Sequence, residues 1–584
     1  MHRTHLSLPV RGLAAGLWFA GLIALGGPTA LSQDPPLDVA RDSGRDLTQA
    51  EPADADAQMS LRSGQPVETT PSTLESFVHT AERYSLKRTS PRMVGDGRSL
   101  IWQERRVRGN AEHVMLDGQR HTSSERVMGV AVSPEGHIAT TAQRAGWRLG
   151  LGLNRWAEVP APIGSPRVSD HGLYAAAPVR LPGGVGLAIG QKEEGKRMSS
   201  EVVGPFAAMR WPDAVFGPGQ GNFVVPVQDR PGGGWRLHAT AAAHEQEQTD
   251  LPTWTDLRPA GFLRPSGRPV FTAFQAGRWR VMTGDEPVGE AMAWIEAPVP
   301  APAADRLGWW ARDADSGRWA LVIDGARVGV GSAVRPAAIR WSPDASTWAV
   351  VVDNGSTMHL AHAFGRDEAC EDIAQASLTL SPVGGRIAYA ARQGDRWFVV
   401  LDGEPGRAHD EIDPASLRFA PDGARLTYAA RDGVTHWRLF DADRPGEGLG
   451  GFVGSHVSAG SMRVNPKDGR LASAGLADGQ AVLLIDGDPV WSGPGVGEPA
   501  WSPDGTVLAC PVLTEAGWRL WVDGRVSEDA LASLLPGSRP WFDAESQQVW
   551  VWGALPAEDR SFGKLIVAWG SLDAGPGLVA VPTD

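Results

Sequence analysis

The chain has 584 residues, of which 42% are hydrophobic and 21% are charged, and its formal net charge is −13. This length exceeds one ordinary compact core and predicts several domains or a repeat architecture. The negative charge argues against a nucleic-acid partner, which would need a basic face, and against electrostatic docking on an anionic membrane.

Residues 1–32 are predicted to be a signal peptide. Positive charge precedes an apolar stretch at residues 12–26, which is too short to span a bilayer comfortably. Ala30 and Ser32 are small residues at the two positions that a signal peptidase inspects, so cleavage is expected after Ser32. An uncleaved anchor is the alternative. No later segment approaches the roughly 18 apolar residues of a membrane span, so no membrane insertion is expected after cleavage.

Residues 33–88 are predicted to be a flexible acidic linker that contains a short helix. The segment contains prolines and carboxylates and has few large apolar side chains, so it cannot bury enough surface to offset the entropy of ordering. Ser72 and Glu75 have the spacing of a capping box, which predicts a helix from there to about Leu86.

The C-terminal half repeats one unit of about 40 residues. Each unit begins with a turn similar to Ser-Pro-Asp-Gly, in which proline presets φ and glycine closes the turn. The chain's 71 glycines and 45 prolines agree with many short elements joined by such turns. The turn prolines follow one another at spacings of 39, 39, 45 and 37 residues: Pro343, Pro382, Pro421, Pro466 and Pro503.

Each unit is predicted to form four antiparallel strands, which is one propeller blade. Residues 387–391 alternate as a strand, and residues 397–401 form a second strand led by Trp397. The pair Asp402-Gly403 is typical of a type I′ hairpin leading to the next strand. Such a pair opens 20 residues after the turn proline in three units, at Asp402, Asp486 and Asp523.

The N-terminal half carries degenerate copies of the unit. Turns at Pro134 and Pro265 and hairpins at Asp117 and Asp324 mark several of them. Further units are predicted near Pro91, Ser169, Pro212, Asp305 and Trp541, which gives about twelve. The fold class is therefore all-β, with tandem β-propellers of four-stranded antiparallel blades.

Propellers typically close with about four to eight blades, so two rings are expected. We predict an N-terminal propeller of degenerate repeats at residues 89–338 and a C-terminal propeller at residues 339–584, with six blades each. A division into seven and five blades is the main alternative.

The unit S-P-D-G…A-Y-x-A…W-x-L-x-V-D-G resembles the repeats of TolB-like, WD40-like propellers of bacterial envelopes. The resemblance covers residues 341–524 well and residues 89–340 loosely. It implies a periplasmic or secreted scaffold whose partners are other envelope proteins. TolB has a folded α/β domain where this chain has a linker, so only the fold and the general role carry over.

Four segments are candidates for chemistry. Residues 342–348 resemble the Asp-box of sialidases but are one residue too short and match the blade turn. Residues 244–248 (HEQEQ) lack the second histidine of a zinc-protease helix. No helix is predicted after residues 217–221 (GPGQG) to present its N-terminus to a phosphate. Two interpretations are open, a cation site and a solvated loop, for the cluster His409, Asp410, Glu411, Ile412 and Asp413.

Cys370 and Cys510 match no zinc or C-x-x-C spacing, and either a disulfide or two buried thiols fit them. The 24 tryptophans recur at one place in the blade, as at Trp397 and Trp518, which favours packing between blades over carbohydrate binding.

The sequence favours a non-catalytic binding or interaction scaffold. We expect no catalytic, metal-binding or cofactor-binding residues and no cofactor, and the pattern identifies no ligand-binding residue. One rival is a glycosidase- or lactonase-like propeller hydrolase whose central channel would need converging carboxylates. A structural envelope component is the other.

Overall fold

The computed structural model describes most of the chain from residue 72 onward. The described residues are 72–77, 89–94, 99–105, 111–117, 119–152, 155–193, 198–217, 221–240, 252–314, 316–329, 333–433, 436–444, 448–543, 548–555, 562–568 and 578–580. The signal peptide and residues 33–71 therefore lie outside them, as do residues 244–248.

Alternating apolar residues and tight turns build the repeated unit, as the eighth blade shows. Its central strand β33 (Ile387–Gln393) pairs antiparallel with β34 (Arg396–Leu401), with Tyr389 opposite Val400. The pair β31 (Asp372–Ile373) and β32 (Thr379–Leu380) forms the inner edge, and β35 (Glu404–His409) forms the outer edge. Apolar faces on both sides of such a sheet must be covered by neighbouring sheets.

Twelve antiparallel sheets of this kind occur among the described residues, which confirms the all-β class and the number of units. The first three blades are β2 (Thr89–Val94), β3 (Ser99–Arg105), β4 (Glu112–Leu116), β5 (Gln119–Ser124); β6 (Arg126–Val132), β7 (Ile138–Gln143), β8 (Trp147–Leu151), β9 (Trp156–Glu158); and β10 (Arg167–Val168), β11 (Tyr174–Leu181), β12 (Gly184–Gln191), β13 (Ser199–Phe206).

Blades 4 to 7 follow in chain order. They are β14 (Ala208–Met209), β15 (Val215–Phe216), β16 (Phe223–Gln228), β17 (Arg236–Thr240); β18 (Asp256–Phe262), β19 (Pro269–Gln275), β20 (Arg278–Thr283), β21 (Glu286–Met292); β22 (Trp294–Ile295), β23 (Val299–Pro300), β24 (Leu307–Arg312), β25 (Trp319–Ile323), β26 (Ala326–Arg327); and β27 (Arg340–Trp341), β28 (Trp348–Asp353), β29 (Met358–His362), β30 (Gly365–Arg366).

Blades 9 to 12 complete the set. They are β36 (Glu411–Ile412), β37 (Arg418–Phe419), β38 (Leu426–Arg431), β39 (Trp437–Asp441), β40 (Leu449–Gly454); β41 (His456–Val464), β42 (Leu471–Ala477), β43 (Gln480–Ile485), β44 (Asp488–Gly493); β45 (Gly495–Val496), β46 (Ala500–Trp501), β47 (Leu508–Thr514), β48 (Gly517–Val522), β49 (Arg525–Ser527), with β54 (Leu578–Ala580); and β50 (Ser533–Leu534), β51 (Trp541–Asp543), β52 (Gln548–Ala554), β53 (Phe562–Ala568), with β1 (Ser72–Phe77).

Helical structure is confined to single turns in the described residues: the 3-10 helices η2 (Trp211–Asp213), η4 (Gln375–Ser377) and η5 (Pro414–Ser416). The described part of the chain also contains no helix with the length and apolar character that a bilayer crossing requires.

The type I′ hairpins predicted from Asp-Gly pairs are confirmed. Asp402 and Gly403 both have positive φ, 54° and 85°, as this turn requires. The Asp402 carboxylate also accepts a hydrogen bond of 2.9 Å from the backbone N–H of Ile387, at the start of the central strand. Asp117, Asp324, Asp486 and Asp523 make the same bond in their own blades. These aspartates therefore stabilise the fold.

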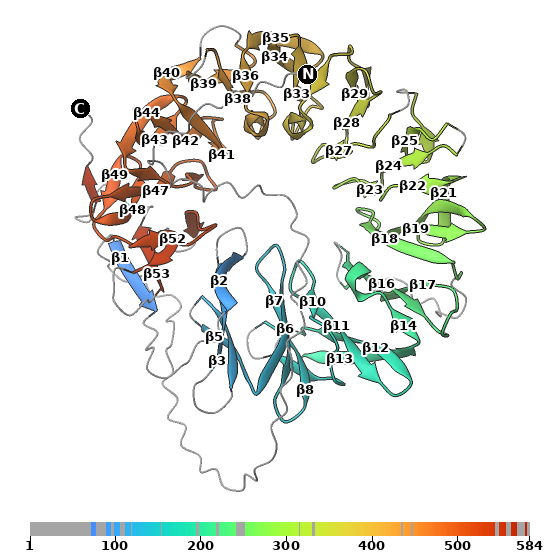
Figure 1. The fold of residues 1–584 in the computed structure, drawn as a ribbon. Coiled ribbons are helices and arrows are strands. Elements are labelled where there is room, and N and C mark those ends of the chain that lie inside the picture. Colours follow the sequence, from blue (N-terminus) through green and yellow to red (C-terminus); the bar gives the residue numbers. More distant parts are fainter. Residues whose placement is uncertain are drawn as a thin grey trace, which may run out of the picture. The chain divides into compact units, whose positions relative to one another are not determined.

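Residues 68–584 form one compact unit, in which each blade packs against the next in chain order and the last packs against the first (Figure 1). Each of the twelve apolar clusters joins two blades that are consecutive around the ring. Trp310 of blade 6 packs with Trp348 of blade 7, and Trp552 of blade 12 packs with Leu100 and Trp102 of blade 1.

This packing corrects the expected division into two rings of six blades. A ring of six would close blade 6 on blade 1, whereas the apolar face of blade 6 is covered by blade 7 and that of blade 1 by blade 12. The twelve blades thus form one propeller, larger than the usual range of about four to eight. Whether residues 339–584 fold independently is a question for experiment, and the faces of blades 7 and 12 that they would leave uncovered predict aggregation.

The predicted helix at residues 72–86 is wrong over the residues described there. Ser72–Phe77 form strand β1, which pairs antiparallel with β53 and supplies the outer strand of blade 12. A capping box stabilises a helix by only about 1 kcal/mol, whereas the open edge of β53 offers the segment a full row of backbone hydrogen bonds. The N-terminal strand therefore closes the ring on its last blade.

Candidate functional site

Arginines join neighbouring blades at one end of the sheets, where the blade turns and the Asp-Gly hairpins lie. In blade 8, Arg386 donates to Asp402 of its own hairpin at 2.8 Å, and to the Ala424 carbonyl at 2.8 Å and Asp443 at 2.7 Å in blade 9. These charges are occupied in holding blades together.

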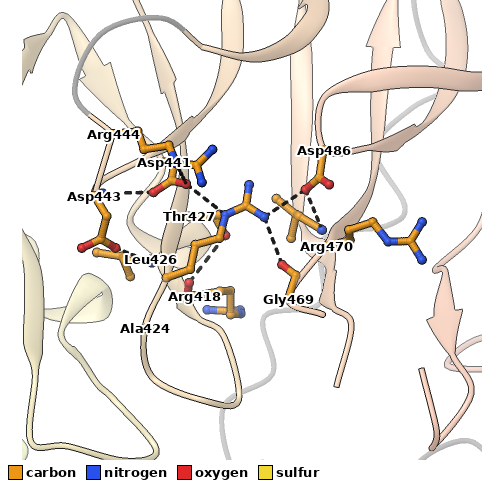
Figure 2. A network of polar contacts seen from close by, with 12 residues as sticks. Arg418, Ala424, Leu426, Thr427, Asp441, Asp443, Arg444, Gly469, Arg470 and Asp486 are labelled. Carbon is orange, nitrogen blue, oxygen red and sulfur yellow. Dashed lines mark hydrogen bonds and ion pairs between the residues drawn. The ribbon is translucent and has the colours of Figure 1, made fainter. Parts of the chain in front are cut away.

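Arg425 repeats this arrangement one blade further on. It donates to Asp441 of blade 9 at 3.0 Å, and to the Gly469 carbonyl at 3.1 Å and Asp486 at 3.2 Å in blade 10. Figure 2 shows Asp441 on one side and Gly469 and Asp486 on the other, converging on this guanidinium. The network spans the gap between two sheets and has a structural role.

Tryptophans reinforce the same joints, as expected from their recurrence. Trp341 and Trp501 donate their indole N–H to carbonyls of the preceding blade, at 3.1 Å in both cases. The guanidinium of Arg306 lies 5.0 Å from the Trp341 ring, within the range of a cation–π contact. Trp397 and Trp518 are half-buried and pack against clusters between blades.

The acidic cluster from His409 to Asp413 is structural. His409 is fully buried, and its ring nitrogens lie 3.0 Å from Asp432 and 3.0 Å from the Tyr428 hydroxyl of blade 9. Burial lowers the pKa of His409 below its usual value, and the hydrogen bond to Asp432 opposes this effect without reversing it. The neutral ring therefore connects the outer strand of blade 8 to blade 9.

The carboxylates of this cluster point to separate partners. Asp410 pairs with Arg396, Glu411 pairs with Arg431, and Asp413 accepts from the Ala415 N–H at 3.0 Å. Among the residues that the structure describes, no group of three or more His, Cys, Asp or Glu side chains could hold a metal ion. The interpretation of these residues as a cation site is not supported.

The other candidates also have structural positions. In the segment resembling an Asp-box, Ser342 accepts from the Thr347 N–H at 3.0 Å across the blade turn. In the glycine-rich segment, Gly217 and Gly221 lie close to the start of strand β16, and residues 218–220 lie outside the described residues. Cys370 and Cys510 are free thiols, which excludes the disulfide. Cys510 lies within the apolar cluster between blades 10 and 11, and its burial there raises its pKa.

A buried histidine in blade 4 predicts acid sensitivity. His238 is 1% exposed, and burial together with the nearby Arg236 lowers its pKa from 6.5 to about 4. Because the unfolded chain then binds a proton that the folded chain excludes, stability rises with pH between about 4 and 6.5 and is level above that range. We expect His238 to reduce the free energy of unfolding by about 3 kcal/mol at pH 4 relative to pH 7.

Urea titrations at several pH values measure this effect. The His238→Phe variant should lose the part of the pH dependence of the unfolding free energy that His238 causes. A phenylalanine should be accommodated at this site, because the Phe206 ring already contacts the His238 ring. An unchanged difference in unfolding free energy between pH 7 and pH 4 in the variant would contradict the assignment.

A pocket of about 350 Å³ lies between blades 7 and 8 at the end of the sheets that carries the hairpins. Blade 7 contributes His362, Phe364 and Asp367, and blade 8 contributes residues 384–387 and residues 402–403. Sequence analysis did not identify any of these residues as a site.

The acidic centre of the pocket is Asp367. Its two carboxylate oxygens lie 3.1 Å from the His362 Nε2 and 2.9 Å from the Tyr389 hydroxyl, which donates. The backbone N–H of Phe364 donates to His362 Nδ1, so the ring proton is on Nε2 and points to Asp367. Burial is the largest influence on the pKa of Asp367 and would raise it, but these hydrogen bonds and nearby histidines together lower it.

Two departures from the repeat meet at this pocket. Ala363 and Phe364 occupy the hairpin of blade 7, where other blades have Asp-Gly. The Ala363 N–H donates to the Trp348 carbonyl at the start of the central strand, as the Asp402 N–H donates to the Ile387 carbonyl in blade 8. Val383 follows the turn proline, where blades 7 and 11 have Asp344 and Asp504. Phe364 is 72% exposed and Val383 is 57% exposed. Comparing the repeats for these exceptions is the signal that could have located the site from sequence.

No family model and no curated protein matches this chain in sequence. Three solved structures are similar in part. A eukaryotic initiation factor is 12% identical, with 50% of this chain and 80% of that chain covered and a TM-score of 0.27. The tricorn protease is 12% identical, with 73% and 46% covered and a TM-score of 0.19. Hsv2 of Kluyvelomyces marxianus is 13% identical, with 47% and 91% covered and a TM-score of 0.24. Likenesses at this level indicate nothing about the activity or partners of this chain.

Proposed function

We propose that this protein is an exported, non-catalytic β-propeller scaffold that binds another protein of the cell envelope. The observation that carries the proposal is the pair Phe364 and Val383, which we name the blade 7/8 surface. Phe364 lines the pocket and Val383 precedes its lining residue Gly384, so two exposed apolar side chains lie on the turns that border one hollow, which supports an interaction surface there. Export and an envelope location rest on the signal peptide predicted at residues 1–32 and on the resemblance to TolB-like repeats.

The pattern of polar contacts supports a binding role over catalysis. The histidine and carboxylates of the candidate cluster at residues 409–413 are hydrogen-bonded or ion-paired to neighbouring groups, as at His409, Asp410 and Glu411. A rigid ring built this way presents a wide surface on which a partner can dock without deforming it.

The experiment is affinity capture from envelope extract after mild crosslinking, with the wild-type protein and the double variant Phe364→Ser/Val383→Ser. The partner recovered with the wild type should be lost with the variant. Val453→Ser is the matched control, because Val453 is also exposed, at 40%, but lies in β40 of blade 9. Equal recovery of every partner by all three proteins would refute the blade 7/8 surface as the binding site.

Export is tested separately by N-terminal sequencing. The mature protein is expected to begin at or near Gln33, because cleavage is predicted after Ser32. A protein that retains Met1 and sediments with membranes would contradict the signal-peptide prediction.

A further inference from the structure

We propose that the pocket between blades 7 and 8 binds a lysine or arginine side chain of the partner protein. This inference rests on the proposed function, because the pocket adjoins the blade 7/8 surface. It is carried by a carboxylate that pairs with no arginine or lysine among the described residues, beside an exposed aromatic ring.

The charge of Asp367 has no arginine or lysine against it in the described residues. Its partners are the His362 ring and the Tyr389 hydroxyl, and burial and the adjoining carboxylate raise the pKa of Tyr389, so that the hydroxyl stays protonated. By contrast, Asp402 on the opposite wall is paired with Arg386 at 2.8 Å. The pocket is thus lined by two carboxylates, Asp367 and Asp402, and by one guanidinium, that of Arg386.

Asp367 also keeps capacity to accept from a ligand. Each carboxylate oxygen has two lone pairs, and each is used once by the bonds described. The Asp367 side chain lines the pocket and is 12% exposed, so it remains accessible. A cation there would form a charge-assisted hydrogen bond, which is stronger than a neutral one.

Phe364 supplies a face for the same cation. A Cβ placed on Gly385 would lie 3.4 Å from Phe364 Cζ, so the ring lies close to the backbone of the blade 8 turn. Its centroid lies 6.0 Å from the His362 ring. A cation entering between Phe364 and Asp367 would therefore meet an aromatic ring on its way to the carboxylate, as cation–π contacts require.

The volume of the pocket and the net charge of the chain both agree with a single basic side chain as the occupant. A volume of about 350 Å³ is at the small end of ligand pockets, which span about 300–1,000 Å³. The net charge of −13 attracts a basic partner over a longer range and repels an acidic one. The apolar stem of lysine or arginine would lie along Phe364 while its charged end reaches Asp367.

The test uses the full chain with two probes, N-acetyl-lysinamide and its neutral analogue N-acetyl-norleucinamide, in NMR titrations. A single side chain is expected to bind in roughly the millimolar range. We expect the lysine probe to bind at least about fivefold tighter than the norleucine probe, and to weaken as salt is added. Equal binding of the two probes would overturn the inference.

Variants assign the effect to the pocket. Asp367→Asn should remove most of the preference for lysine. Asp432→Asn is the control, because Asp432 also accepts from a histidine but lies outside the pocket, where it is paired with Arg407. Phe364→Leu keeps apolar area and removes the aromatic face, so it should weaken the lysine probe and spare the norleucine probe. This second variant decides the question if Asp367→Asn does not fold.

Failure of this inference is distinguishable from failure of the proposed function. If envelope capture is lost in Phe364→Ser/Val383→Ser and normal in Asp367→Asn, the partner docks by apolar contact and the cation site is refuted alone. If capture depends on none of these residues, the blade 7/8 surface itself is refuted.

Discussion

A fragment of residues 339–584 is expected to aggregate when produced alone, whereas the full chain should remain soluble and melt in a cooperative transition. The fragment keeps blades 7 to 12 but loses both neighbours that cover its ends. The side chains of Trp348, Val350 and Val352 would lose blade 6, and Trp552 would lose blade 1. Apolar faces of this size, together with open strand edges, promote association between chains.

The fragment also lacks β1, so β53 would be left as an open edge strand. Light scattering and size-exclusion chromatography of the fragment measure the expected aggregation. A soluble fragment with its own cooperative melting transition would show instead that blades 7 to 12 can close into a ring by themselves. That outcome would restore the boundary near residue 338.

Trp309→Ala is expected to lower the free energy of unfolding by about 3–5 kcal/mol, the usual loss on emptying a large aromatic core site. Trp309 is 1% exposed in the apolar cluster between blades 5 and 6. A Cβ on Gly289 would lie 3.2 Å from its ring, which shows how closely blade 5 packs against it. Chemical denaturation at pH 7 measures the loss, provided that the transition is two-state.

Two companion variants separate burial from residue type. Trp294→Ala is the matched control in the same blade, since Trp294 is 39% exposed, and it should change stability far less. Trp309→Phe should cost less than Trp309→Ala, because it keeps most of the ring and removes an indole N–H that is buried without a hydrogen-bond partner. Equal losses for Trp309→Ala and Trp294→Ala would show that packing between blades does not dominate stability at this joint.

The structure confirms a β-propeller of twelve similar blades, whereas the resemblance to TolB-like repeats, the partner, the location and the activity stay predictions. A hydrolase with its site in the central channel is the rival function. Assays on glycoside and lactone substrates would address it directly.

The sequence by itself determined the blade. Its turns and hairpins depend on local backbone preferences, so Pro343, Asp402 and Gly403 could be interpreted correctly one unit at a time. The alternation within a strand such as β33 likewise predicts which faces are buried, because side chains point to opposite faces in turn.

Only the tertiary structure decided how many blades share a ring, what residues 72–77 become and where the pocket lies. Ring size depends on a small angle repeated at every joint between blades, which no single unit encodes. Strand β1 forms because β53, almost 500 residues away in the chain, offers an open edge. The pocket exists because two exceptional turns, at Phe364 and Val383, belong to blades that become neighbours only when the ring is assembled.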